Sequence, residues 1–137
     1  MRFIGRTALC TVVAVIASAC GSSSPTTPAA PNTSGTWTGT VTDAVMGQGT
    51  VRLTITQSGS SLAGTWATTY ANVTANNSGT LTGAVNNATV TATLIPTIPT
   101  SCPFNATATQ NGNAMSGTYT AFNCAMAVSG SISVSKQ

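Results

Sequence analysis

The segment from Val51 to Trp66, VRLTITQSGSSLAGTW, decides the fold. Apolar residues alternate with polar ones from Val51 to Ile55, and the alternation resumes from Leu62 to Trp66 after Ser58-Gly59-Ser60. Strict alternation places the apolar residues on one face of a strand. A short Gly-containing break between two such runs is typical of a hairpin. The segment therefore predicts a β-hairpin with one buried face.

The same pattern returns as Phe104–Tyr119, FNATATQNGNAMSGTY, with Gln57 aligned to Gln110 (110 − 57 = 53) and no gap. Residues 88–94 copy 35–41 at the same offset of 53. Besides the hairpin 51–66, strands are predicted at 35–41, 79–85, 88–94, from 104, at 115–119 and at 126–134. The chain therefore carries two copies of a four-strand unit.

Eight short antiparallel strands over about 100 residues can close into an up-and-down barrel, which removes both sheet edges. Inward glycines at 39, 64, 83, 117 and 130 let the strands coil. An all-β, eight-stranded antiparallel up-and-down barrel is therefore predicted, with a two-sheet sandwich as the alternative. The outward residues are Thr and Ser, which excludes a barrel embedded in lipid.

Charged residues make up only 4% of the chain, His is absent, and Asp43 is the single acidic residue. General acid–base catalysis needs a titratable group, and a Ser or Thr nucleophile needs a base beside it. Asp43 falls in a predicted loop, as a solvated carboxylate. We therefore predict no enzyme, no catalytic residue and no cofactor. Only Arg52 and Lys136 are basic after residue 34, so no nucleic-acid partner is expected.

Residues 1–19 resemble a bacterial lipoprotein signal peptide. Arg2 and Arg6 precede an apolar run, 8–17, that is too short to span a bilayer, and Ala17-Ser18-Ala19 leads directly to Cys20. The resemblance implies cleavage before Cys20, lipidation of its thiol, export, and attachment to a membrane of the cell envelope. Gly21, rather than an Asp, directly follows Cys20, and this resembles lipoproteins that go on to the outer membrane.

The alternative for this leader is an ordinary secretory signal cut after Ala19, which leaves Cys20 as a free thiol. Residues 20–34 form a Ser/Pro-rich tether, and residues 35–137 form the barrel domain. The two remaining cysteines, Cys102 and Cys124, are predicted to form a disulfide in an exported chain. Two Cys without His make a poor zinc site, so no metal site is predicted.

The inward positions carry no charge, and the interior is either a filled core or an apolar cavity. A filled core is the preferred prediction, and the alternative of a cavity rests on the inward Gly and Ala residues, which leave volume unfilled. If a ligand binds inside, the predicted contact residues are Trp37, Leu53, Ile55, Trp66, Leu81, Phe104, Met115, Tyr119 and Met126.

Gly35-Thr36-Trp37 resembles the Gly-x-Trp motif that begins the first strand of lipocalins, and is also similar to the first strand of avidin-like barrels. The lipocalin resemblance implies a basic residue near the end of the barrel beside the Trp, and Lys136 or Arg52 could serve. It implies a carrier of a small apolar ligand.

The architecture also resembles small lipoprotein barrels that inhibit hydrolases in the bacterial envelope. That resemblance implies an interaction or inhibitor-like module with an envelope protein as partner, acting through loops at 42–48, 70–77 and 95–103. Both functions stay open at this point.

Overall fold

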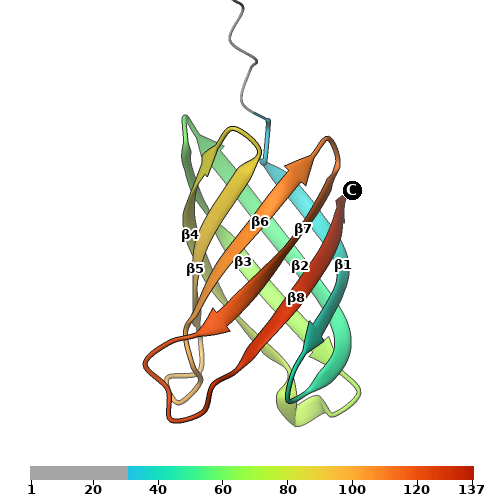
Figure 1. Cartoon of the computed structure of the whole chain (residues 1–137), viewed down its shortest axis with the longest axis vertical. Coiled ribbons are helices and arrows are strands. Elements are labelled where there is room, and N and C mark those ends of the chain that lie inside the picture. Colours follow the sequence, from blue (N-terminus) through green and yellow to red (C-terminus); the bar gives the residue numbers. More distant parts are fainter. Residues whose placement is uncertain (1–30) are drawn as a thin grey trace, which may run out of the picture.

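The computed structural model describes residues 31–137. The predicted signal peptide, the lipidation site Cys20 and the tether up to residue 30 lie outside these residues. The described chain forms eight strands and one short 3-10 helix (Figure 1): β1 (Gly35–Asp43), β2 (Gly47–Ser58), β3 (Ser61–Tyr70), η1 (Val73–Ala75), β4 (Asn77–Asn86), β5 (Thr89–Pro96), β6 (Phe104–Asn111), β7 (Ala114–Ala121) and β8 (Ser129–Lys136).

The strands form a closed barrel in the order β1 to β8, with every neighbour antiparallel. Closure comes from pairing of the first and last strands, in which Trp37 lies opposite Lys136. A closed sheet leaves no unpaired edge. The predicted up-and-down barrel is confirmed, and the two-sheet sandwich is wrong. Residues 31–137 contain the whole sheet, so they form a self-contained folding unit.

The sequence repeat is also a repeat of register. In the β2–β3 pair Ile55 lies opposite Gly64, and in the β6–β7 pair Ala108 lies opposite Gly117, each 53 positions later (55 + 53 = 108; 64 + 53 = 117). Two hairpins with the same register therefore stand in the two halves of the barrel.

The two ends of the barrel differ. At the turn end, Gly59-Ser60, Asn87-Ala88 and Gly112-Asn113 connect strands, and the first residue of each turn has positive φ, as tight hairpin turns require. The described chain also begins and ends there, at the top of Figure 1. At the loop end, the connections are 44–46, 71–76, 97–103 and 122–128. The longer connections therefore all lie at one end of the barrel.

The inward residues form one continuous apolar core, in which Trp37 in β1 is 0% exposed. The inward glycines leave no free volume beside them, so they do not supply the unfilled space that the cavity alternative assumed. A Cβ atom at Gly64 would overlap the Thr54 carbonyl oxygen, and one at Gly117 would overlap that of Thr107. The coiled backbone of the neighbouring strand occupies the place of the missing side chain.

The last strand begins later than predicted. Alternation from Met126 to Val134 predicts a strand, but β8 starts at Ser129, and Met126 is 62% exposed in the loop 122–128. The reason is that β7 ends at Ala121 and its pairing with β8 stops at Ser129, so the earlier residues have no partner strand. The predicted loop 70–77 contains η1. No helix within 31–137 is long and apolar enough to cross a membrane.

Candidate ligand-binding site at the loop end of the barrel

A cavity of about 260 Å³ lies inside the loop-end half of the barrel. Its wall combines inward strand residues with residues of all the loop-end connections, and most of it is apolar. The strand residues include Val41, Val51, Leu53, Trp66, Leu94, Phe104, Ala106, Tyr119 and Ile132, and the loop residues include Met46, Thr74, Ala75, Ile98, Thr100, Cys102, Met126 and Val128. The mouth of the cavity therefore lies among the loops.

Three aromatic side chains form part of the wall. The Phe104 ring packs edge-on against Trp66 at 6.1 Å and against Tyr119 at 5.5 Å between ring centroids. The Trp66 indole N–H donates to the Thr80 carbonyl oxygen at 3.2 Å, which keeps the ring fixed. Edge-to-face packing is a favourable geometry for such rings, so this side of the cavity is shaped before any ligand arrives.

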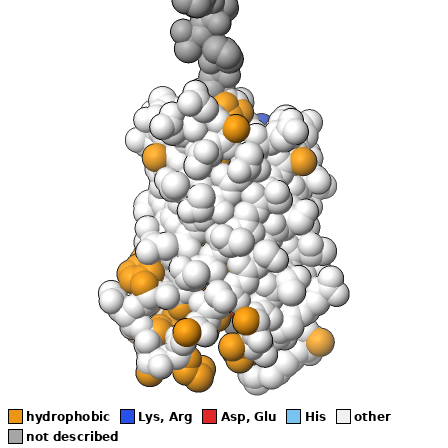
Figure 2. Space-filling view, viewed as in Figure 1, with side chains coloured by type: hydrophobic (Ala, Val, Ile, Leu, Met, Phe, Trp, Pro, Cys, Tyr) orange, Lys and Arg blue, Asp and Glu red, His pale blue; other side chains and the backbone are white. Residues whose placement is uncertain are grey.

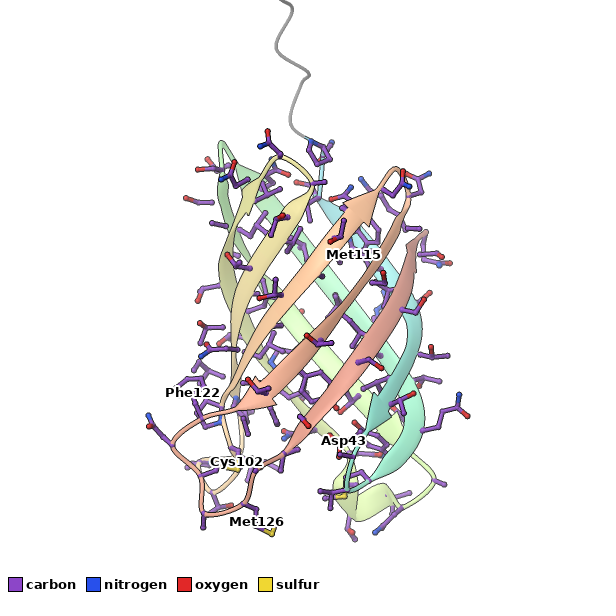
Figure 3. The ribbon with its side chains drawn as sticks, in the orientation of Figure 1. Asp43, Cys102, Met115, Phe122 and Met126 are labelled. Carbon is purple, nitrogen blue, oxygen red and sulfur yellow. A yellow bond between two sulfur atoms is a disulfide. The ribbon has the colours of Figure 1, made fainter. Side chains whose placement is uncertain are left out.

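The cavity has one charged group, the carboxylate of Asp43 at the end of β1 (Figure 3). Asp43 is only 6% exposed. Its Oδ1 accepts hydrogen bonds from the backbone N–H groups of Val45 and Met46 at 2.8 and 2.9 Å, and its Oδ2 accepts one from the Tyr119 hydroxyl at 2.6 Å. The expectation of a solvated loop carboxylate is wrong, because the inward alternation of β1 continues one step past Val41.

Two tyrosines, Tyr119 and Tyr70, lie near this carboxylate in the cavity wall. Burial raises the pKa of Tyr119 well above its ordinary value, and the hydrogen bond to Asp43 raises it further. Burial also raises the pKa of Tyr70, which lies beside Tyr119 in the same wall. Both tyrosine hydroxyls are therefore neutral at physiological pH. They add no charge to the cavity wall beside Asp43.

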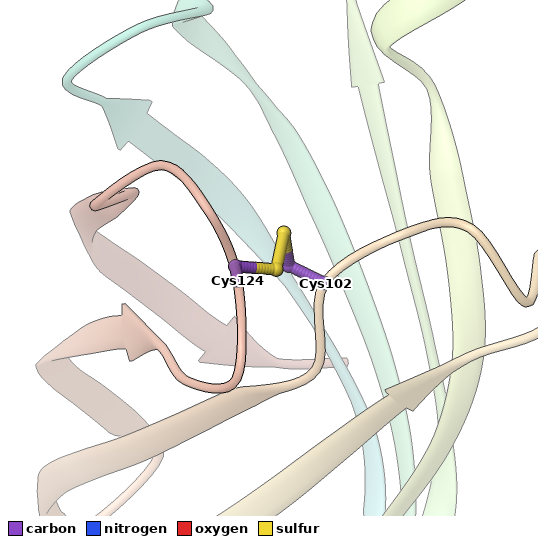
Figure 4. The surroundings of a disulfide bond; sticks show 2 residues. All are labelled: Cys102 and Cys124. Atoms are coloured by element: carbon purple, nitrogen blue, oxygen red, sulfur yellow. A yellow bond between two sulfur atoms is a disulfide. The ribbon is translucent and has the colours of Figure 1, made fainter.

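A disulfide joins two of the loops at the mouth. Cys102 in loop 97–103 is bonded to Cys124 in loop 122–128 (Figure 4), with a Cα–Cα distance of 5.8 Å. The disulfide predicted from the sequence is confirmed. Cys102 is itself part of the cavity wall, so the bond fixes the two loops that bound one side of the mouth.

The opposite end of the barrel is closed by the chain itself. Thr33 is 0% exposed. Its backbone N–H donates to Gln57 Oε1 at 2.7 Å and its hydroxyl donates to Gln110 Oε1 at 2.8 Å. Its carbonyl oxygen accepts from the Trp37 indole N–H at 2.9 Å. Gln57 and Gln110 occupy equivalent positions of the repeat, so each copy contributes one amide to this plug.

Of the two basic residues considered from the sequence, Lys136 is the one beside Trp37. Its Nζ lies 5.8 Å from the Trp37 ring centroid and donates to the Asn32 carbonyl oxygen at 3.0 Å. A cation at that distance over an indole is attracted to the ring face. Arg52 is exposed on the outer face of β2.

The structure separates the predicted ligand-contact residues into two groups. Leu53, Trp66, Phe104, Tyr119 and Met126 line the cavity, with Met126 on a loop at the mouth. The others, Trp37, Ile55, Leu81 and Met115, are buried core residues outside the cavity wall.

Asp43, Tyr70 and the two plug amides were not predicted as site residues. The inward phase of Asp43 after Trp37 and Val41 could have indicated Asp43, and the occurrence of Gln at equivalent positions 57 and 110 of the repeat could have indicated the two amides.

Exposed apolar side chains surround the mouth. The set is Val45, Met46, Val73, Ile98 and Met126, each between 46% and 74% exposed. They come from every loop-end connection, and Figure 2 shows hydrophobic side chains gathered at this end of the molecule. We call this set the apolar rim. No protein-family model matches the chain, and no curated protein is significantly similar to it in sequence.

Proposed function

We propose that this barrel is a non-catalytic binding protein of the cell envelope that holds a small, mainly apolar ligand in the loop-end cavity. The observation that carries the proposal is the cavity of about 260 Å³ with its largely apolar wall. A cavity of roughly 150 Å³ is enough for benzene. Scaling by volume gives room for about ten non-hydrogen atoms, which is a fragment or a short chain.

The plug supports a binding function with a single mouth. Thr33 and the two glutamines close the turn end, so a ligand can enter only among the loops. In the proposed arrangement the chain is lipid-anchored through Cys20, on the outer membrane. The tether then meets the barrel at the plugged end, and the mouth faces away from the anchor.

The Gly35-Thr36-Trp37 strand and the Lys136 ammonium over Trp37 support a lipocalin-like origin of the barrel. In that comparison the Trp–cation pair belongs to the closed end and has no contact with the ligand. Its contribution is to hold the base of the barrel shut, which the hydrogen bond from Trp37 to the plug also does.

The test is binding of a neutral hydrophobic fluorophore of matching size, naphthalene, to purified residues 31–137. Ala106 lies in the cavity wall, and Ala106→Phe fills the cavity from β6. We expect the wild type to bind the probe and Ala106→Phe to lose at least about tenfold in affinity. Ala63→Phe, on the exposed outer face of β3, is the matched control and keeps binding. A wild type that binds no probe would refute the proposal.

A second function, an interaction or inhibitor-like module, is favoured by the apolar rim. Exposed apolar patches rimmed by polar residues are typical of interaction sites, and Val73 is 74% exposed. The partner would be an envelope protein with an apolar docking surface. We expect Val73→Ser with Val45→Ser to abolish a cross-link to that partner while leaving probe binding unchanged, because neither residue lines the cavity. A cross-link that persists in this variant would contradict the role of the rim.

A further inference from the structure

The charge inventory of the cavity is one-sided. Of the four Lys and Arg residues, Arg2 and Arg6 precede the barrel, which leaves two (4 − 2 = 2). Neither of these two, Arg52 and Lys136, lines the cavity. Asp43 does, and it is the single acidic residue of the whole sequence. The described barrel therefore presents one negative charge and no positive charge to whatever occupies the cavity.

The Asp43 carboxylate has one acceptor position left. A carboxylate offers about four lone-pair sites, two on each oxygen. Oδ1 uses two sites, for the N–H groups of Val45 and Met46. Oδ2 accepts from Tyr119. These bonds hold the side chain in place at the cavity wall and leave one site on Oδ2 for a further donor.

A buried carboxylate without a cationic partner is costly, and an opposite charge on a ligand offsets that cost. The same field disfavours a ligand that carries a negative charge. Tyr119 carries no positive charge, and its raised pKa keeps its hydroxyl protonated, so that it donates a neutral hydrogen bond to Asp43. The group that best completes this site is a positively charged hydrogen-bond donor.

The place of Asp43 fixes how such a ligand lies. Asp43 ends β1 and pairs with Gly130 near the loop end, whereas Leu53, Leu94 and Trp66 line the apolar interior. A charged head at Asp43 stays close to the mouth, and an apolar tail then extends toward the aromatic wall. Gly130 has a specific part here, because a Cβ atom at this position would overlap the Tyr119 hydroxyl that holds Asp43.

We propose that the cavity is specific for cationic amphiphiles, in which an ammonium-type head binds the Asp43 carboxylate and a short apolar tail fills the cavity. This inference rests on the proposed ligand-binding function and adds the ligand's charge class to it. Neutral alcohols of the same length bind more weakly through a single hydrogen bond. Fatty acids of that length bind weakest, because they bring a second carboxylate to a site without a cation.

The experiment is displacement of naphthalene from residues 31–137 by decylamine, decanol and decanoate at neutral pH, below their micelle concentrations. An alkylamine is protonated there and an alkanoic acid is ionised. We expect decylamine to bind at least about tenfold more tightly than decanoate, with decanol between them. Equal competition by decylamine and decanoate would overturn the inference and leave the proposed function standing. Absence of any probe binding would instead refute the proposed function.

Variants identify the group responsible. Asp43→Asn keeps an Oδ1 acceptor for Val45 and Met46, so we expect it to fold, to lose about tenfold in decylamine affinity and to keep its decanol affinity. Arg52→Gln, on the outer face, is the control for net charge and leaves the order of ligands unchanged. Thr100→Lys places a cation on an exposed residue of the mouth and should favour decanoate even if Asp43→Asn misfolds. Unchanged decylamine binding in both Asp43→Asn and Thr100→Lys would overturn the inference.

Discussion

Replacing Thr33 by valine tests whether the plug is an integral part of the fold. Valine has nearly the shape of threonine, so the change removes one hydroxyl and leaves the backbone bonds of residue 33 in place. That hydroxyl is fully buried and donates to Gln110 Oε1 at 2.8 Å. Gln110 is itself only 4% exposed, so water cannot easily replace the lost donor.

The cost follows from the group left behind. A buried acceptor deprived of its partner costs about 1–3 kcal/mol of unfolding free energy, more than the net value of the bond itself. For a domain of about 100 residues, each kcal/mol lowers Tm by about 4–8 °C. When Gln110→Leu is added to Thr33→Val, neither polar group remains, and we expect the pair to be less destabilised than the sum of the single variants.

The assay is thermal and urea unfolding of residues 31–137, followed by far-ultraviolet circular dichroism. Thr40→Val is the matched control, because Thr40 is an exposed residue of β1, the strand that follows Thr33, and such surface changes stay within about 0.5 kcal/mol. A Thr33→Val variant as stable as Thr40→Val would refute the reasoning. It would mean that the segment before β1 is only an appendage to a barrel that closes without it.

Three further predictions concern stability. Replacing both Cys102 and Cys124 by Ser should lower the free energy of unfolding by about 3 kcal/mol in the chain-entropy model, measured by urea unfolding. Adding reductant to the wild type should cost the same amount, and a smaller loss on reduction would count against this role of the disulfide. Because the pKa of Tyr119 is raised, the unfolded chain releases the Tyr119 proton first. The contribution of Tyr119 to the free energy of unfolding is therefore fully present below pH ~10 and falls above it by up to about 1.4 kcal/mol per pH unit. Tyr119→Phe should flatten this alkaline decrease, and an unchanged slope would contradict the raised pKa of Tyr119. Gly64→Ala should destabilise the barrel by about 1–3 kcal/mol or more, because the added Cβ would overlap the Thr54 carbonyl oxygen. The control Ala63→Gly, in the same strand, should cost no more than about 1 kcal/mol. A Gly64→Ala protein as stable as the wild type would show that the strands are free to shift.

Much of the fold could be predicted from the sequence because its signals are local. Alternation from Val51 to Trp66 specifies a hairpin and its buried face, and the 53-residue repeat extends the pattern to the rest of the barrel. The repeat is also visible in the structure, where the pairs Ile55–Gly64 and Ala108–Gly117 have equivalent registers. The disulfide, which the structure contains, was predicted from the cysteine count and the expectation of export.

The site was harder to predict, because a cavity is a property of the whole packing arrangement. Inward phase marked Trp66, Phe104 and Tyr119, which line the cavity, but it also marked Trp37 and Met115, which pack into the core outside the cavity. Depth along the barrel separates the two groups, and depth depends on strand tilt and on which end is closed. Alternation in one strand carries no information about either.

The sequence by itself determined the strands, their faces, the duplication and the near absence of charge, because each follows from neighbouring residues or from composition. Only the tertiary structure decided that Thr33 closes one end and that Asp43 is buried among Tyr119 and backbone donors at the other. The Thr33–Gln110 contact joins residues 77 positions apart, and the Asp43–Tyr119 contact joins residues 76 positions apart. Such contacts exist only once the barrel has closed, because closure is what brings the ends of distant strands together around one axis.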